Sequence, residues 1–124
     1  MVRIFTTKTF DRWFRKTGLT DEALRNAVAE MAEGLVDADL GAGVFKKRIA
    51  IAGRGKRSGA RTLVASNLGD RWFFLFGFEK NERANVSDQE LKVLQIMGQI
   101  FLAYNPAEIS TALREGQLKE INHD

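Results

Sequence analysis

The sequence predicts a single α+β domain in which helices flank an antiparallel meander sheet. Residues 44–51, 60–66 and 71–78 are rich in β-branched and aromatic side chains and follow one another through short links, which favours antiparallel pairing. Apolar residues at helical spacing lie before and after these segments. The 124 residues contain no linker, repeat or low-complexity tract, so we expect one domain over residues 1–124.

The first third of the chain predicts a strand and a helical hairpin. Residues 2–6 read as a short strand, and Thr7 or Thr9 can cap the helix that follows. Gly18 is expected to end this helix, and Thr20 to start the next one. The first helix should bury Phe10, Trp13 and Phe14, and the second Leu24, Ala27, Val28, Met31 and Leu35.

The sheet segments are joined by two different links. Residues 67–70 have the composition of a hairpin turn, whereas residues 52–59 are expected to form a Gly-rich, basic connection. After the sheet, Ser87 and Glu90 form a capping box ahead of a long helix with an apolar stripe from Leu91 to Tyr104. Asn105 then caps a short helix that runs to about residue 114, and residues 117–122 read as a final strand.

Composition excludes several classes of chemistry. The chain has no cysteine and one histidine, His123, which argues against thiolate nucleophiles, zinc sites and a Ser-His-Asp triad. We therefore expect no metal and no cofactor. The apolar runs are far shorter than the roughly 20 residues needed to span a bilayer, and the first residues lack the apolar stretch of a signal peptide. A cytoplasmic protein without a membrane contact is the expectation.

Positive charge is concentrated in the middle of the chain. The net charge is +3, but residues 43–83 alone hold ten Lys and Arg against three acids. Such a concentration favours a polyanion, and nucleic acid first, as the partner. A solvated basic surface without a partner is the alternative.

Strand alternation predicts which of these cations gather. Phe45, Ile49 and Ile51 should face the core, so that Lys46 and Arg48 share the open face. Lys47 falls on the core side, where we expect its ammonium to reach water at an edge. Further cations, Arg61, Lys80 and Arg83, flank the neighbouring strands and are expected to converge on the same face.

A Lys/Arg cluster suits phosphodiester chemistry. Arginine binds phosphate through two parallel hydrogen bonds, and a lysine among like charges can act as a base. RNA cleavage can use the 2′-hydroxyl of the RNA as nucleophile, so it requires neither a metal nor a nucleophile from the protein. Cations that only bind phosphate, or only solvate the sheet, remain alternatives.

The basic link between the first two sheet segments does not match a phosphate-binding loop. That pattern requires Gly at position 50, which is Ala50, and Ser or Thr at position 57, which is Arg57. We expect Arg54, Lys56 and Arg57 instead to contact RNA backbone, with a plain surface loop as the alternative.

The sequence also resembles the RelE/HigB-type toxins of bacterial type II toxin–antitoxin systems, most closely a HigB-like branch. The resemblance covers nearly the whole chain and is carried by the combination of residues 20–24, 34–41, 44–50, 59–62 and 70–85. It implies a RelE-like fold and an endoribonuclease, an mRNA interferase, that inhibits translation by cleaving mRNA on the ribosome. It also implies a cognate helix-turn-helix antitoxin as partner.

The resemblance places functional residues one at a time. It matches the paired basic residues of the family to Lys46 and Arg48, the arginine of the next strand to Arg61, and the basic run after the third strand to Lys80 and Arg83, which become the candidate catalytic residues. Asn81 and Ser87 depart from the RelE pattern of arginine and tyrosine, and base stacking would then fall to Phe76, Phe78 or Tyr104. The candidate RNA-binding residues are Lys47, Arg54, Lys56, Arg57, Phe78 and Asn81.

Two other functions compete with RNA cleavage. A ParE-type toxin acts on gyrase with the same fold and no nuclease activity, and the grouping of Lys46, Arg48 and Arg61 counts against it. A non-catalytic module that binds RNA or the ribosome would need only the charge.

Overall fold

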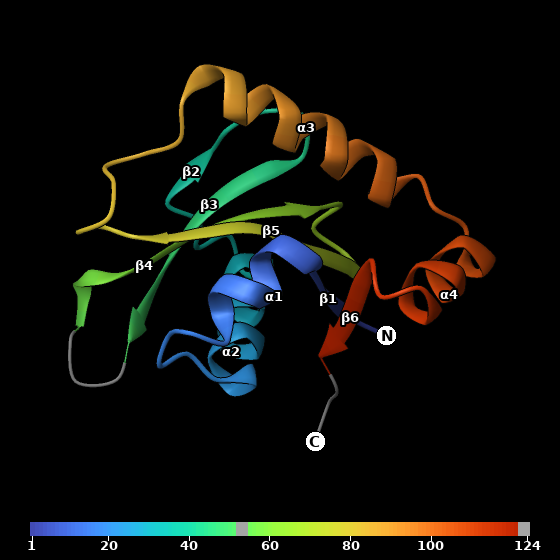
Figure 1. Cartoon of the computed structure of the whole chain (residues 1–124), viewed down its shortest axis with the longest axis horizontal. Coiled ribbons are helices and arrows are strands. Elements are labelled where there is room, and N and C mark those ends of the chain that lie inside the picture. Colours follow the sequence, from blue (N-terminus) through green and yellow to red (C-terminus); the bar gives the residue numbers. More distant parts are fainter. Residues whose placement is uncertain (52–54, 122–124) are drawn as a thin grey trace.

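The computed structural model describes residues 1–51 and 55–121 and confirms the α+β class, with helices on both faces of a six-stranded sheet (Figure 1). The strand order is β2-β3-β4-β5-β1-β6. The strands are β1 (Arg3–Thr7), β2 (Ala38–Asp39), β3 (Val44–Ile51), β4 (Gly55–Ser66), β5 (Arg71–Glu79) and β6 (Leu118–Ile121). The antiparallel meander β3-β4-β5 is as predicted, and β1 lies between β5 and β6, parallel to β5 and antiparallel to β6.

The helices divide between the two faces of the sheet (Figure 1). One face carries α1 (Lys8–Phe14) and α2 (Asp21–Ala32), and the other carries α3 (Asp88–Leu102) and α4 (Pro106–Arg114). Each helix begins after a side chain that accepts a backbone N–H: Thr7, Thr20, Ser87 and Asn105. These caps confirm the predicted helix starts, because the side-chain oxygen satisfies an N–H that the helix itself cannot.

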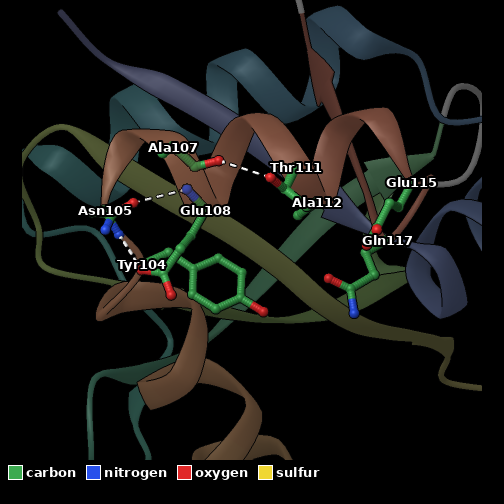
Figure 2. A pocket seen from close by; sticks show the side chains of 8 residues that line it. All are labelled: Tyr104, Asn105, Ala107, Glu108, Thr111, Ala112, Glu115 and Gln117. Atoms are coloured by element: carbon green, nitrogen blue, oxygen red, sulfur yellow. Dashed lines mark hydrogen bonds between the residues drawn. The ribbon is translucent and has the colours of Figure 1, made fainter.

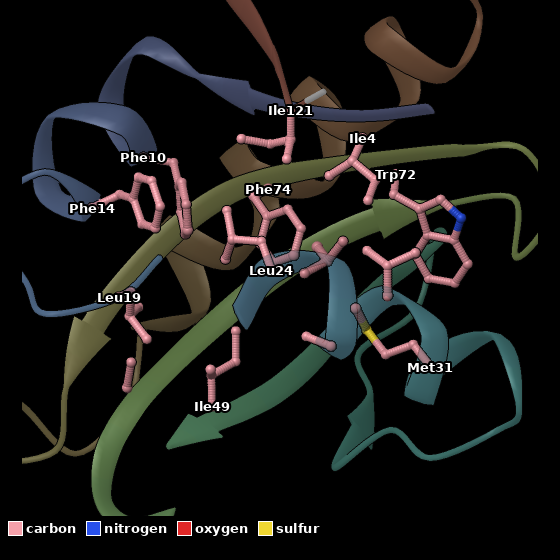
Figure 3. Packing of buried hydrophobic residues seen from close by; sticks show 14 of the residues in the cluster. Ile4, Phe10, Phe14, Leu19, Leu24, Met31, Ile49, Trp72, Phe74 and Ile121 are labelled. Carbon is pink, nitrogen blue, oxygen red and sulfur yellow. The ribbon is translucent and has the colours of Figure 1, made fainter. Parts of the chain in front are cut away.

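Two apolar clusters, one on each face, hold the layers together. The α1–α2 side buries Phe10, Leu24, Trp72 and Phe74 (Figure 3). The α3–α4 side buries Phe5, Phe73, Phe101 and Leu118, among others. Because β6 contributes Ile121 to the first cluster and Leu118 to the second, the last strand closes both cores.

Several element boundaries differ from the sequence prediction. Helix α1 ends at Phe14, before Gly18, and Leu35 lies beyond the end of α2 with 59 % of its surface exposed, so it is not part of the core. Strand β4 begins at Gly55 rather than near residue 60, which shortens the predicted link. The two-residue strand β2 was not predicted, because it is too short to show any period.

A β-bulge interrupts the regular alternation of β5. Leu63 pairs with Phe76 and the next residue, Val64, pairs with Phe74, so that Leu75 is the extra residue. Leu75 and Phe76 therefore both pack on the α3 side, while Gly77 faces the Trp13 indole on the α1 side. The bulge brings Phe76 and Phe78 to the face on which the candidate site lies.

Within residues 1–51 and 55–121, no helix combines the length and the apolar character that crossing a membrane would require.

Candidate functional site

The site is built on a row of directly paired residues across three strands. Arg48 of β3 lies opposite Arg61 of β4, and Arg61 lies opposite Phe78 of β5. Residues paired in this way have Cβ atoms about 5 Å apart and point to the same face of the sheet. Lys46, two residues before Arg48, shares this face, which is the α3 side, because the neighbouring Val44 and Leu63 belong to the α3-side cluster.

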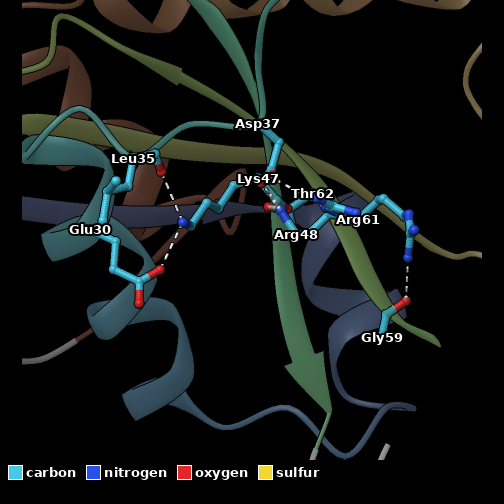
Figure 4. Close-up of polar contacts among 8 residues, drawn as sticks. All are labelled: Glu30, Leu35, Asp37, Lys47, Arg48, Gly59, Arg61 and Thr62. Carbon is cyan, nitrogen blue, oxygen red and sulfur yellow. Dashed lines mark hydrogen bonds and ion pairs between the residues drawn. The ribbon is translucent and has the colours of Figure 1, made fainter. Parts of the chain in front are cut away.

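Arg61 is the most buried cation of this row. The residue is 8 % exposed, and its Nη1 donates a hydrogen bond of 3.2 Å to the carbonyl oxygen of Gly59 on its own strand (Figure 4). A guanidinium held by a backbone carbonyl keeps a fixed direction.

Arg48 is held by Asp37. Its Nε donates to Asp37 Oδ1 at 3.1 Å, and its backbone N–H donates to Oδ2 at 2.7 Å (Figure 4). Burial alone would raise the pKa of Asp37, but the hydrogen bonds and the charge of Arg48 outweigh it, and the pKa lies below its usual value. The Arg48 side chain remains 47 % exposed.

Arg83 reaches the same region from the segment after β5. Its Nη1 donates to Glu90 Oε2 at 3.0 Å and its Nη2 to Oε1, so the pair is bidentate. The guanidinium carbon lies 5.9 Å from the ring centroids of both Phe76 and Phe78. The hydrogen bonds from Arg83, followed by that from the Ser87 N–H, lower the pKa of Glu90 to about 2. Arg83 thus lies over the ring that ends the Arg48–Arg61–Phe78 row.

The structure separates Lys47 from this site. Its Nζ lies 2.7 Å from Glu30 Oε1 and donates to the Leu35 carbonyl oxygen at 2.9 Å, on the α2 side of the sheet (Figure 4). The side chain is 5 % exposed, so the expectation that its ammonium reaches water at an edge was wrong. The sequence around Lys47 does not indicate that Glu30 of α2 would lie beside it.

The other candidate residues divide by exposure. Lys80 and Asn81 lie exposed in the turn directly after β5. No hydrogen bond or ion pair joins the side chain of Lys46 or of Lys80 to another of the described residues. Phe78 is 2 % exposed, so its ring offers no open face to a base, whereas Phe76 is half-buried.

The basic link predicted at residues 52–59 lies largely outside the residues that the structure describes. Arg54 is outside the described residues. Lys56 and Arg57 belong to β4, and their side chains are outside the described part of the chain.

Two carboxylates of the site were missed from the sequence. The sequence predicted Glu90 as part of the capping box with Ser87. It did not indicate that Glu90 also pairs with Arg83. Asp37 could not be predicted as a partner of Arg48, because the loop between α2 and β2 brings the two residues together only in the folded chain. Both pairs are at least one-third exposed on the arginine side, and solvent screens an exposed ion pair.

Two pockets lie outside the row of cations, one beside the start of α3 and one beside α4. One of about 180 Å³ is lined by Phe76, Glu90, Val93 and Leu94, beside the Arg83–Glu90 pair. The other, of about 460 Å³, lies along α4 and is lined by residues that include Tyr104, Glu108, Ala112 and Gln117 (Figure 2).

The fold and the site together define a class of small α+β proteins in which Lys46, Arg48 and Arg61 lie on one face of the sheet. Residues 2–121 match the family model described as the RelE toxin of the RelE/RelB toxin–antitoxin system, and the chain belongs to this family. It is a toxin of a toxin–antitoxin system, and the family implies an antitoxin as its partner. The comparison with curated proteins found no match.

Proposed function

We propose that this toxin is a ribosome-dependent endoribonuclease that inhibits translation by cleaving mRNA. The observation that carries the proposal is the register that places Arg48 and Arg61 side by side on one face, with Lys46 on the same face. Two arginines paired in this way are close enough for their guanidinium groups to bind the oxygens of one phosphodiester. We also propose that the toxin is of the HigB-like branch and acts in the cytoplasm. Its antitoxin is proposed to be a helix-turn-helix protein.

The proposed reaction uses the 2′-hydroxyl of the RNA as nucleophile. Its oxygen forms a bond to phosphorus, the bond from phosphorus to the 5′-oxygen breaks, and a cyclic phosphate results. Lys46 accepts the proton of the 2′-hydroxyl, and Arg48 and Arg61 stabilise the charge that grows on the phosphate oxygens. Arg61 or Arg83 stabilises the leaving 5′-oxygen, which takes a proton from water to become a hydroxyl. Lys80 and Asn81 bind RNA at the rim of the site.

Induced expression followed by mapping of new mRNA 5′ ends tests this function. We expect new ends within translated reading frames for the wild type and their loss for Arg61→Ala. The matched control is Arg114→Ala, which removes an exposed arginine of α4. Growth arrest that persists in Lys46→Ala, Arg61→Ala and Arg83→Ala, each shown to be folded, would contradict cleavage.

A non-catalytic module that binds RNA or the ribosome is the second candidate. It is favoured by the Arg48–Asp37 and Arg83–Glu90 pairs, since an arginine whose charge is already balanced by a carboxylate is less able to stabilise the charge that grows in a transition state. Growth arrest without new 5′ ends, in cells whose ribosomes carry the toxin, would support it. Inhibition of gyrase in a supercoiling assay would instead support ParE-type activity.

A further inference from the structure

The segment between α2 and β2 fixes the backbone of β3 at the candidate site. The Asp37 N–H donates to the carbonyl oxygen of Lys46 at 2.9 Å, and Asp37 Oδ2 accepts the backbone N–H of Arg48 at 2.7 Å. Lys46 and Arg48 are the two residues that β3 contributes to the site. A single residue outside the site therefore holds the strand at both of them.

Asp37 also binds one end of the Arg48 guanidinium. Its Oδ1 accepts from Nε at 3.1 Å, and no hydrogen bond joins Nη1 or Nη2 of Arg48 to another of the described residues (Figure 4). Four of the five N–H donors of a guanidinium belong to the two Nη atoms, and two parallel N–H groups can bind two oxygens of one phosphate. Asp37 therefore restricts the direction of Arg48 and leaves these donors available to a phosphate.

The pair of Arg83 with Glu90 has a different geometry. Glu90 accepts from both Nη1 and Nη2 of Arg83, and the carbonyl oxygen of Asn85 accepts from its Nε at 3.0 Å. Arg83 must leave Glu90 before its Nη atoms can bind an anion, whereas Arg48 can bind one while it stays paired. Of these two ion pairs, that of Arg48 suits a positioning role.

Asp37 is itself anchored from the α2 side of the sheet. Lys47 Nζ donates to the carbonyl oxygen of Leu35, two residues before Asp37, and lies 2.7 Å from Glu30 Oε1. Burial raises the pKa of Asp37, but the hydrogen bonds from Arg48 and the charges of Arg48 and Lys47 outweigh it. The carboxylate is therefore ionised at neutral pH, on a segment that a buried lysine holds in place.

We propose that Asp37 is a positioning residue of the candidate site, which holds Arg48 through its Nε and backbone N–H so that Nη1 and Nη2 bind the phosphodiester. That this phosphodiester belongs to mRNA rests on the proposed function, whereas the positioning of Arg48 does not. Loss of Asp37 leaves the charge of Arg48 intact but lets its side chain take other directions, and a misplaced group lowers the rate of a reaction.

The single-turnover rate of cleavage of ribosome-bound mRNA tests this role. We expect Asp37→Ala to cleave about 10- to 100-fold more slowly than the wild type, because Arg48 loses its fixed direction. The matched control is Asp39→Ala, which removes an exposed carboxylate of β2 whose Oδ1 accepts the N–H of Gly41. This control should cleave within about twofold of the wild type, and urea denaturation verifies that each variant is folded.

A double-mutant cycle separates positioning from a general structural role. If Asp37 acts through Arg48, Asp37→Ala slows the wild type but changes the rate of Arg48→Ala by less than about twofold. An equal loss in both backgrounds would overturn the proposal. A folded Asp37→Ala variant that cleaves at the wild-type rate would overturn it as well, and a faster one would show that the carboxylate competes with the phosphate for Arg48. These results leave the proposed function standing.

The Nε–H resonance of Arg48 gives a measurement that needs no cleavage. It is assigned by its loss in Arg48→Ala, and its exchange with water should be at least about tenfold faster in Asp37→Ala than in the wild type or in Asp39→Ala. An unchanged exchange rate would contradict the positioning role. A wild-type toxin that does not cleave ribosome-bound mRNA, but whose Arg48 exchanges faster in Asp37→Ala, contradicts the proposed function and supports the positioning of Arg48.

Discussion

Three consecutive cations of β3 show how the side of the sheet decides the role of a residue. Lys46 and Arg48 project to the open face and enter the candidate site, while Lys47 projects to the opposite face and joins α2 to the sheet through Glu30 and the Leu35 carbonyl. The alternation of a strand predicted this separation from the sequence. The burial of Lys47 was not predictable, because the carboxylate that permits it comes from a helix 17 residues earlier in the chain.

Glu30→Gln is expected to destabilise the protein. Lys47 would then keep a buried ammonium with neutral acceptors but no carboxylate to balance its charge, and we expect the free energy of unfolding to fall by about 1–3 kcal/mol. Urea denaturation measures the change. Glu33→Gln, an exposed change near the end of the same helix, should stay within about 0.5 kcal/mol of the wild type, and an equal loss in both variants would contradict the role of the pair.

Glu90 is expected to make stability depend on pH in the acid range. Its pKa in the folded protein is about 2 against 4.5 for the free side chain, so its stabilising contribution is present above pH 4.5 and is lost as the pH falls toward 2. The urea midpoint of the wild type should exceed that of Glu90→Gln at pH 6, and the two should approach each other at pH 2 to 3. A difference that stays constant over this range would show that ionised Glu90 does not stabilise the fold.

At the scale of the elements, the helix starts were predictable and the ends of the strands were not. A cap is a local event, in which Ser87 or Asn105 satisfies an N–H three residues ahead, so the pattern is visible in the sequence. The β4 start at Gly55 and the strand β2 depend on partners across the sheet. The bulge in β5 likewise depends on the register with β4, and it is the bulge that turns Phe76 toward the site.

Gly77→Ala tests the contact between α1 and β5. A Cβ at position 77 would lie 2.3 Å from Cζ3 of Trp13, so the indole must move, and we expect a loss of about 1–3 kcal/mol in the free energy of unfolding. In the Trp13→Ala background the obstacle is gone, and the same glycine change should cost much less. Equal costs in the two backgrounds, measured by urea denaturation, would show that the indole does not explain the glycine.

At the scale of the whole molecule, the candidate site depends on strands that pack against distant parts of the chain. The meander β3-β4-β5 sets the register of Arg48 with Arg61, and β1 holds β5 on its other edge. Sequence reasoning predicted which cations share a face. The pairing of Arg48 and Arg83 with carboxylates, and the insertion of β1 between β5 and β6, are long-range contacts without a local pattern.

If cations from neighbouring strands act on one phosphodiester, the single-turnover rate of cleavage of ribosome-bound mRNA depends on the charge of Arg61. Arg61→Met keeps much of the side-chain volume of a nearly buried residue while removing the charge. We predict that this variant, folded as judged by its unfolding midpoint, cleaves about 100- to 1,000-fold more slowly than the wild type, whereas Arg114→Ala is unaffected. A folded Arg61→Met variant that cleaves at the wild-type rate would contradict the account.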